Sequence, residues 1–131
     1  MQRRFLVLGI PAAAALALAG CKSAPGDELI GYWIERSSDG RIRSIARIQR
    51  QNGALVLTVA QFSALGGATP IETHLPLVYS RDLGQHGVQA ATGIIPIRRH
   101  GDALIVNADA LQPSTAELYA KWLKADRRNT L

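Results

Sequence analysis

The sequence predicts an all-β domain, an antiparallel meander of seven or eight short strands that forms a small barrel or sandwich. Two observations carry this prediction. Apolar and polar residues alternate in short segments, as in strands with one buried face. Turn signals separate these segments at intervals of roughly ten residues, and short turns make neighbouring strands antiparallel. Asp39-Gly40 and Asn52-Gly53 are the strongest signals, because tight hairpin turns need positive φ angles.

The first three strands are expected at residues 29–36, 41–50 and 54–62, on either side of these two turns. In the second of them, apolar and basic residues alternate, and Ile45 interrupts the alternation. Both flanking strands are rich in Leu, Ile and Val, as strands that face a core usually are. These three strands therefore make the most regular part of the predicted sheet.

Residues 63–73 contain Gly66-Gly67 and Pro70 and are expected to form a loop. A strand at 74–80 follows, and Pro76 places its start late or at a sheet edge, because proline lacks the amide hydrogen that a ladder needs. Further strands are expected at 88–92, 94–99 and 103–108.

The segment 115–123 fits two structures. As a strand, it completes the meander. As a short helix, it places Leu118, Trp122 and Ala125 on one side. We expect a strand here, followed by a charged tail at 124–131 that frays.

The N-terminus has the three parts of an export signal. Arg3 and Arg4 supply positive charge, residues 5–19 are apolar, and small residues precede Cys21. The tetrapeptide LAGC at 18–21 resembles the lipobox of bacterial lipoproteins. An ordinary secretory signal with an incidental cysteine is the alternative.

The lipobox resemblance implies cleavage after residue 20, a diacylglycerol thioether on Cys21 and an N-acyl chain on its new amine; no other cofactor is expected. Two acyl chains are enough for stable anchoring in a lipid bilayer. Lys22 follows the cysteine, which resembles the sorting pattern of outer-membrane lipoproteins facing the periplasm, with the inner membrane less favoured. The expected divisions are a signal peptide at 1–20, a lipidated cysteine and linker at 21–28, a β domain at 29–123 and a tail at 124–131.

The amino-acid composition limits the kinds of partner and of stabilising group that the domain can have. The whole chain carries a formal charge of +5, which falls to +3 once Arg3 and Arg4 leave with the signal peptide. This mild charge and an export signal argue against nucleic acid as a partner. Cys21 is the only cysteine, so the domain has no disulfide and no zinc site built from cysteines.

The run Leu29-Ile30-Gly31-Tyr32-Trp33 resembles the G-x-W opening of lipocalin-like domains, which small bacterial lipoproteins often carry. The later segments 103–106 and 118–121 resemble the closing strand and Y-x-K part of those chains. The resemblance implies a barrel in which Gly31 and Trp33 are structural and Trp33 closes one end. An unrelated sandwich with a buried tryptophan is the alternative.

Five arginines are candidates for a contact surface. Three alternate along the second predicted strand, and two precede a turn; they are Arg41, Arg43, Arg47, Arg98 and Arg99. The planar guanidinium pairs well with carboxylate and phosphate groups. A solvated face that keeps the sheet soluble is the competing interpretation.

No catalytic motif is visible. The three histidines, His74, His86 and His100, have no metal-ligand spacing, and no serine lies in a nucleophile-elbow pattern. We therefore expect no enzyme activity and no metal site.

Two binding functions are expected, and a purely structural role is the alternative to both. In the first, a periplasm-facing lipoprotein binds an apolar small molecule or lipid inside its β domain. In the second, the domain is a protein-interaction module of the cell envelope, such as an assembly component or an inhibitor or immunity lipoprotein against a periplasmic hydrolase. The arginines and the Gly-rich loop would then contact the partner.

Overall fold

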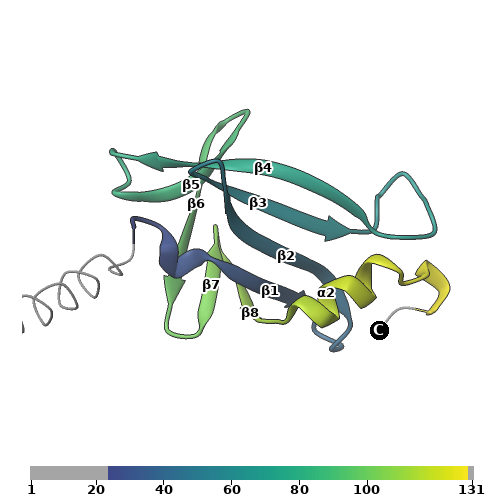
Figure 1. The fold of residues 1–131 in the computed structure, drawn as a ribbon. Coiled ribbons are helices and arrows are strands. Elements are labelled where there is room, and N and C mark those ends of the chain that lie inside the picture. Colours follow the sequence, from purple (N-terminus) through teal and green to yellow (C-terminus); the bar gives the residue numbers. More distant parts are fainter. Residues whose placement is uncertain (1–23, 130–131) are drawn as a thin grey trace, which may run out of the picture.

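A closed antiparallel barrel of eight strands forms the centre of the computed structural model, which describes residues 24–129 (Figure 1). Each strand pairs with the next, and β8 pairs with β1. This confirms the predicted all-β meander and resolves it as a barrel. The predicted signal peptide and Cys21 lie outside the described residues. The strands are β1 (Gly31–Arg36), β2 (Ile42–Gln51), β3 (Ala54–Gln61), β4 (Ile71–Ser80), β5 (Gln85–Ala90), β6 (Gly93–His100), β7 (Ala103–Val106) and β8 (Asp109–Pro113).

The β2–β3 hairpin turns at Asn52 and Gly53, with φ of 51° and 84°, as the sequence predicts. Ile45, which interrupts the alternation in β2, has a physical explanation. It lies on the outer face of the barrel and is fully buried under the C-terminal helix. A bulge in the β1–β2 register next to Arg36 shifts Ile42 to the same cluster.

β4 begins three residues before the expected 74–80, β6 extends the expected 94–99 by one residue at each end, and both strands continue through a proline. Pro76 pairs with β3, and the pairing of β4 with β5 begins one residue later. Pro96 likewise ends the β5 pairing, and the β7 pairing begins at Ile97. Each proline therefore lies where the strand changes partner, a position that tolerates the missing amide hydrogen.

The expected strand over 103–108 is wrong in its C-terminal part. Asn107 adopts a left-handed φ of 59° and reverses the chain, so that Val106 pairs with Asp109. Asparagine tolerates this conformation because its short polar side chain bonds locally. An eighth strand, β8, therefore follows at once, at residues for which no strand was predicted.

The expected strand over 115–123 is also wrong: this segment is the helix α2 (Ala116–Leu123). Thr115 caps its N-terminus, with Oγ1 accepting a hydrogen bond of 3.1 Å from the Leu118 amide. β8 already pairs with β1 and closes the barrel, so no strand position is left for the segment.

α2 packs across the outside of β1, β2 and β3, where a second apolar cluster forms (Figure 1). The indole Nε1 of Trp122 donates a hydrogen bond of 2.8 Å to the Ala60 carbonyl oxygen, and the ring meets Phe62 edge to face. Ala125 is also buried here, and a 3-10 turn, η2 (Arg127–Asn129), follows. The described part of the tail that was expected to fray is therefore held at Ala125, which is buried, and at Arg127, which bonds to the β3–β4 loop.

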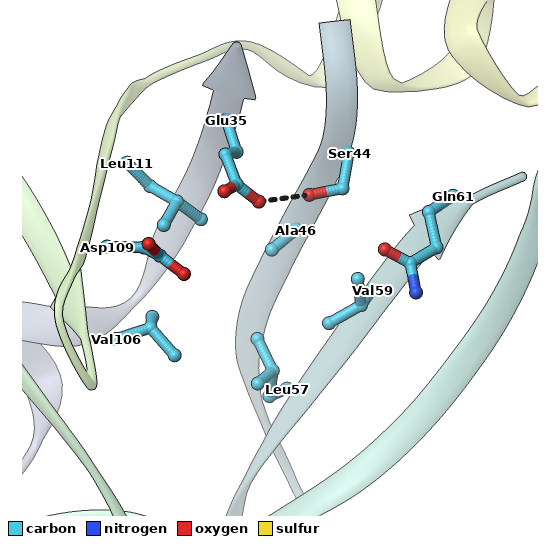
Figure 2. Close-up of a pocket in the computed structure, with 9 residues that line it drawn as sticks. All are labelled: Glu35, Ser44, Ala46, Leu57, Val59, Gln61, Val106, Asp109 and Leu111. Carbon is cyan, nitrogen blue, oxygen red and sulfur yellow. Dashed lines mark hydrogen bonds between the residues drawn. The ribbon is translucent and has the colours of Figure 1, made fainter. Parts of the chain in front are cut away.

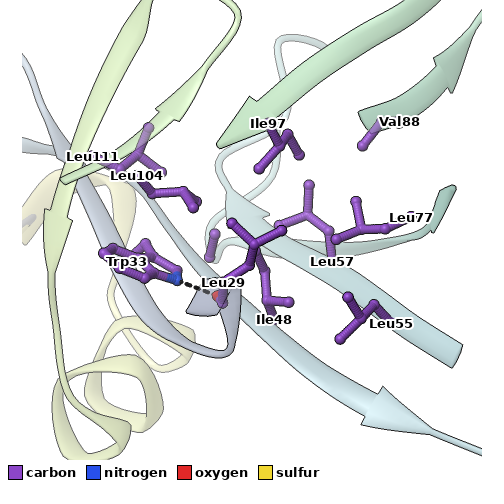
Figure 3. Close-up of a cluster of buried hydrophobic side chains, with 11 residues drawn as sticks. Leu29, Trp33, Ile48, Leu55, Leu57, Leu77, Val88, Ile97, Leu104 and Leu111 are labelled. Atoms are coloured by element: carbon purple, nitrogen blue, oxygen red, sulfur yellow. Dashed lines mark hydrogen bonds between the residues drawn. The ribbon is translucent and has the colours of Figure 1, made fainter. Parts of the chain in front are cut away.

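The barrel interior is filled with side chains (Figure 3). They come from every strand and from the short 3-10 helix η1 (Asp27–Leu29), which precedes β1 and lies against β6. Leu29 is 1% exposed and Trp33 is 3% exposed. Residues 24–28, which were expected to be a linker, thus belong to the folded domain. Among residues 24–129, no helix has the length and apolar character needed to cross a membrane.

Candidate functional site

One cavity enters the barrel interior at the end where β1 and β3 finish and β2 starts (Figure 2). Its volume is about 130 Å³. The alternation of side chains along β1, β2 and β3 directs every second residue toward it. The apolar lining consists of Ala46, Leu57, Val59, Val106 and Leu111, and the polar lining of Glu35, Ser44, Gln61 and Asp109.

The size of the cavity decides what it can hold. Drug-sized ligands occupy sites of about 300 to 1,000 Å³. An engineered apolar cavity of about 150 Å³, close to the size found here, binds benzene. Since core side chains fill the rest of the barrel, the cavity accommodates one ring or a short branched chain rather than a whole acyl chain.

Two carboxylates lie at the rim of the cavity. Glu35 is 22% exposed in its side chain, accepts a hydrogen bond of 3.4 Å from Ser44 Oγ, and lies 3.7 Å from Arg43 Nη1. Asp109 is exposed at the start of β8 and forms no ion pair within residues 24–129. The mouth of this barrel therefore carries two carboxylates and one guanidinium, and only the carboxylate of Asp109 has no cationic partner among residues 24–129.

Neither carboxylate was predicted from the sequence as a site residue. Glu35 lies two residues after Trp33, so strand alternation alone places the two side chains on the same face of β1. Asp109 had no such signal, because β8 was not predicted and a residue between strands is ordinarily solvated.

The three arginines predicted along one strand face lie in different surroundings. Arg41 is exposed in the β1–β2 turn and lies 3.9 Å from Asp39. Arg43 approaches Glu35 at the cavity rim. Arg47 is partly covered by α2: its guanidinium lies over the Tyr119 ring at 5.4 Å, and its Nε is buried without a hydrogen-bond partner.

The other two arginines lie near the N-terminal segment. Arg98 lines a second pocket, of about 230 Å³, together with Pro25, Gly26 and Tyr79. Arg99 donates to the carbonyl oxygens of Glu28 and Gly101, and its guanidinium lies 5.7 Å from the centre of the Trp33 ring. The five predicted arginines are thus distributed between the β1–β2 turn, the cavity rim, the helix interface and the N-terminal end.

Gly31 and Trp33 stand at the start of β1. Gly31 has a φ of 147°, a backbone conformation that favours glycine. The Trp33 side chain points into the core, and its Nε1 donates to the Leu29 carbonyl oxygen (Figure 3). Cys21, the predicted lipid site, lies outside the described residues.

The loop between β3 and β4 is held in place by the C-terminal segment. Arg127 donates from Nε to Gly67 O at 2.9 Å and from Nη2 to Ser63 O at 2.7 Å, and its backbone amide donates to Ala68 O at 2.8 Å. Leu65, near the centre of this loop, is 99% exposed. A fixed loop with an exposed leucine is unusual for a solvated connection.

The histidines provide no metal centre in the described part of the chain. His74 Nδ1 lies in hydrogen-bond contact with Thr58 Oγ1, at 2.8 Å. Between residues 24 and 129, no three His, Asp or Glu side chains gather closely enough to hold a metal ion.

Comparisons with protein-family models, with curated proteins and with solved structures gave no significant match to this chain.

Proposed function

We propose that the mature protein is a lipoprotein, held by acyl chains on Cys21 at the periplasmic face of the outer membrane, that binds a small ligand without chemical turnover. The ligand enters the barrel mouth beside Glu35 and Asp109. It carries a ring or short branched apolar group with a positive charge beside it. The cavity of about 130 Å³ between Leu57, Val59 and Val106, with Glu35 and Asp109 at its rim, is the observation that supports this proposal.

Chemistry at the cavity supports this class of ligand. An apolar group of the ligand displaces water from the five apolar side chains. This burial favours binding by about 25 cal/mol per Å² of apolar surface. A cation then lies near carboxylates that are partly exposed, where each pair contributes up to about 1 kcal/mol. The expected Kd for one such fragment is therefore weak, about millimolar.

The experiment uses three probes of equal size and different charge: benzylamine, benzyl alcohol and benzoate. Ligand-observed NMR on the lipidated protein in nanodiscs should rank their affinities in that order. Asp109→Asn should lower the affinity for benzylamine about two- to fivefold and leave benzyl alcohol unchanged.

Two variants of β3 control for the location of the probe. Val59→Phe fills the cavity and should abolish binding, whereas Val56→Phe changes the opposite face of the same strand and should leave binding intact. Equal binding by both variants, or no preference for the cationic probe, would contradict this ligand class.

The β3–β4 loop favours the second candidate, a protein-interaction module of the envelope. Leu65 projects from a loop that Arg127 already fixes, so that burying it in a partner costs little ordering entropy. A photoreactive residue at 65 should crosslink one discrete protein in intact cells, and the same residue at Leu83 should not. Identical crosslinking patterns from the two positions would exclude a specific contact through this loop.

A further inference from the structure

The barrel end at which the N-terminal segment enters carries exposed apolar side chains. Tyr79 is 57% exposed and Leu83 is 47% exposed, both on or beside the turn that joins β4 to β5. This turn lies beside the N-terminal segment, since Gly84 and Gln85 line the same pocket as Pro25 and Gly26. In Figure 1 the start of the described chain and this turn lie at one end, and the β3–β4 loop lies at the other.

Very little chain separates this end from the proposed anchor. Two residues stand between Cys21 and Ala24, so their Cα atoms are at most about 11 Å apart. The headgroup layer on one side of a bilayer is about 5 to 8 Å thick. An acylated Cys21 therefore holds Ala24 within a few ångströms of the bilayer surface.

The N-terminal segment is also fastened to the barrel, so the domain has little freedom to swing away. Asp27 pairs with Arg50 of β2 and accepts a hydrogen bond of 2.8 Å from the Ala24 amide. Leu29 is buried in the core and bonded to Trp33. The direction in which the barrel leaves the membrane is thus set by contacts within the fold.

We propose that the β4–β5 hairpin is a second membrane contact, with Tyr79 and Leu83 lying in the lipid headgroup layer. This rests on the lipid anchor proposed above. Tyrosine is enriched at membrane interfaces, because its ring is apolar and its hydroxyl remains hydrated. The cavity mouth at the ends of β1 and β3 then faces the periplasm.

Apolar contact rather than charge drives this docking. Arg81, Arg98 and Arg99 are exposed at this end and suit lipid phosphates, but Asp82 and Glu28 are exposed there too and offset two of these three charges. Since the opposing charges nearly cancel, the contact should depend weakly on salt.

The chain provides a direct test, because acylation consumes its only cysteine and any introduced cysteine becomes a unique labelling site. Leu83→Cys and Tyr79→Cys carry a polarity-sensitive fluorophore, and Leu65→Cys at the opposite end is the matched control. The lipidated proteins are reconstituted in vesicles of phosphatidylethanolamine and phosphatidylglycerol that contain a nitroxide-headgroup lipid. We expect blue-shifted, strongly quenched emission from positions 79 and 83, and aqueous, unquenched emission from position 65.

Two outcomes would overturn the proposal in distinguishable ways. If the protein floats with the vesicles but positions 79 and 83 emit like position 65, the hairpin does not touch the bilayer and the anchor stands. If the protein does not float with the vesicles, the anchor itself fails and the hairpin contact fails with it.

Discussion

The indole Nε1 of Trp33 donates a hydrogen bond to the carbonyl oxygen of Leu29, 2.9 Å away. Both residues are almost fully buried in the barrel interior. The bond fixes the η1 turn against the start of β1, so that Leu29 fills the N-terminal end of the core. It therefore connects the N-terminal segment to the barrel that carries the cavity.

Trp33→Phe should remove this bond and leave a buried carbonyl oxygen without its partner. The expected loss in the free energy of unfolding is about 1 to 3 kcal/mol, measured by urea denaturation. A loss below about 0.5 kcal/mol, within the range of ordinary surface substitutions, would show that the bond contributes nothing.

Asp27 should make the stability of the protein depend on pH in the acid range. The hydrogen bond from Arg50, and next that from the Ala24 amide, hold the pKa of the Asp27 carboxyl below its usual 3.8. A lowered folded pKa means that the stabilisation is present above pH 3.8 and is lost as the pH falls through the lowered value. At neutral pH, the urea midpoint of the wild-type protein should therefore be higher than that of Asp27→Asn. This difference between the two midpoints should vanish in strong acid. Asp102→Asn, at an exposed turn, is the control, and an identical profile for both variants would count against the Asp27–Arg50 contact.

Gly26→Ala should disturb the same end through a collision. A Cβ atom there would lie 2.4 Å from Leu55 Cδ1 and 2.9 Å from His86 Cε1, at a residue with φ of 90°. Gly66→Ala is the matched control, because its φ of 109° is also strained but open space surrounds it. Strain alone should cost Gly66→Ala about 1 kcal/mol, and the collision should add about 1 to 3 kcal/mol for Gly26→Ala. Equal losses in thermal denaturation would mean that the N-terminal segment moves aside freely.

The contact of Tyr119 with the sheet should stabilise the protein at neutral pH and be lost at alkaline pH. Its hydroxyl donates a hydrogen bond to Glu72 of β4. Burial first, and then the bond and charge of Glu72, raise the pKa of Tyr119 above its usual 10.0. The stabilisation is therefore complete below pH 10.0 and is lost as the pH rises above it. Tyr119→Phe should lose about 1 kcal/mol at neutral pH, and this deficit should shrink in alkali. If the stability deficit of Tyr119→Phe does not change with pH, the hydrogen bond of the hydroxyl is not its cause.

Much of the barrel could be predicted from local signals. The Asn52-Gly53 turn and the alternation in β3 specify the central hairpin, because the short-range chemistry and the final contacts agree there. The errors occur where tertiary contacts decide. Asn107 reverses the chain inside an apolar run, and α2 is a helix because β8 already occupies the strand position beside β1.

The candidate site was less predictable than the fold. Glu35 could be assigned to the inner face by its spacing from Trp33, but Asp109 reaches the rim only through the β7–β8 turn. Arg47 illustrates the opposite case. It shares a strand face with basic neighbours in the sequence, yet α2 returns from the far end of the chain and places Tyr119 over it.

The most direct test of the account is the intact mass of the protein purified from bacterial membranes, beside a Cys21→Ser variant. We expect wild type to begin at residue 21 and to carry the mass of a diacylglycerol and an N-acyl chain, and the variant to lack these groups and leave the membrane fraction. A wild-type chain that still begins at Met1, or one whose Cys21 is a free thiol, would contradict the anchor and with it the orientation of the barrel.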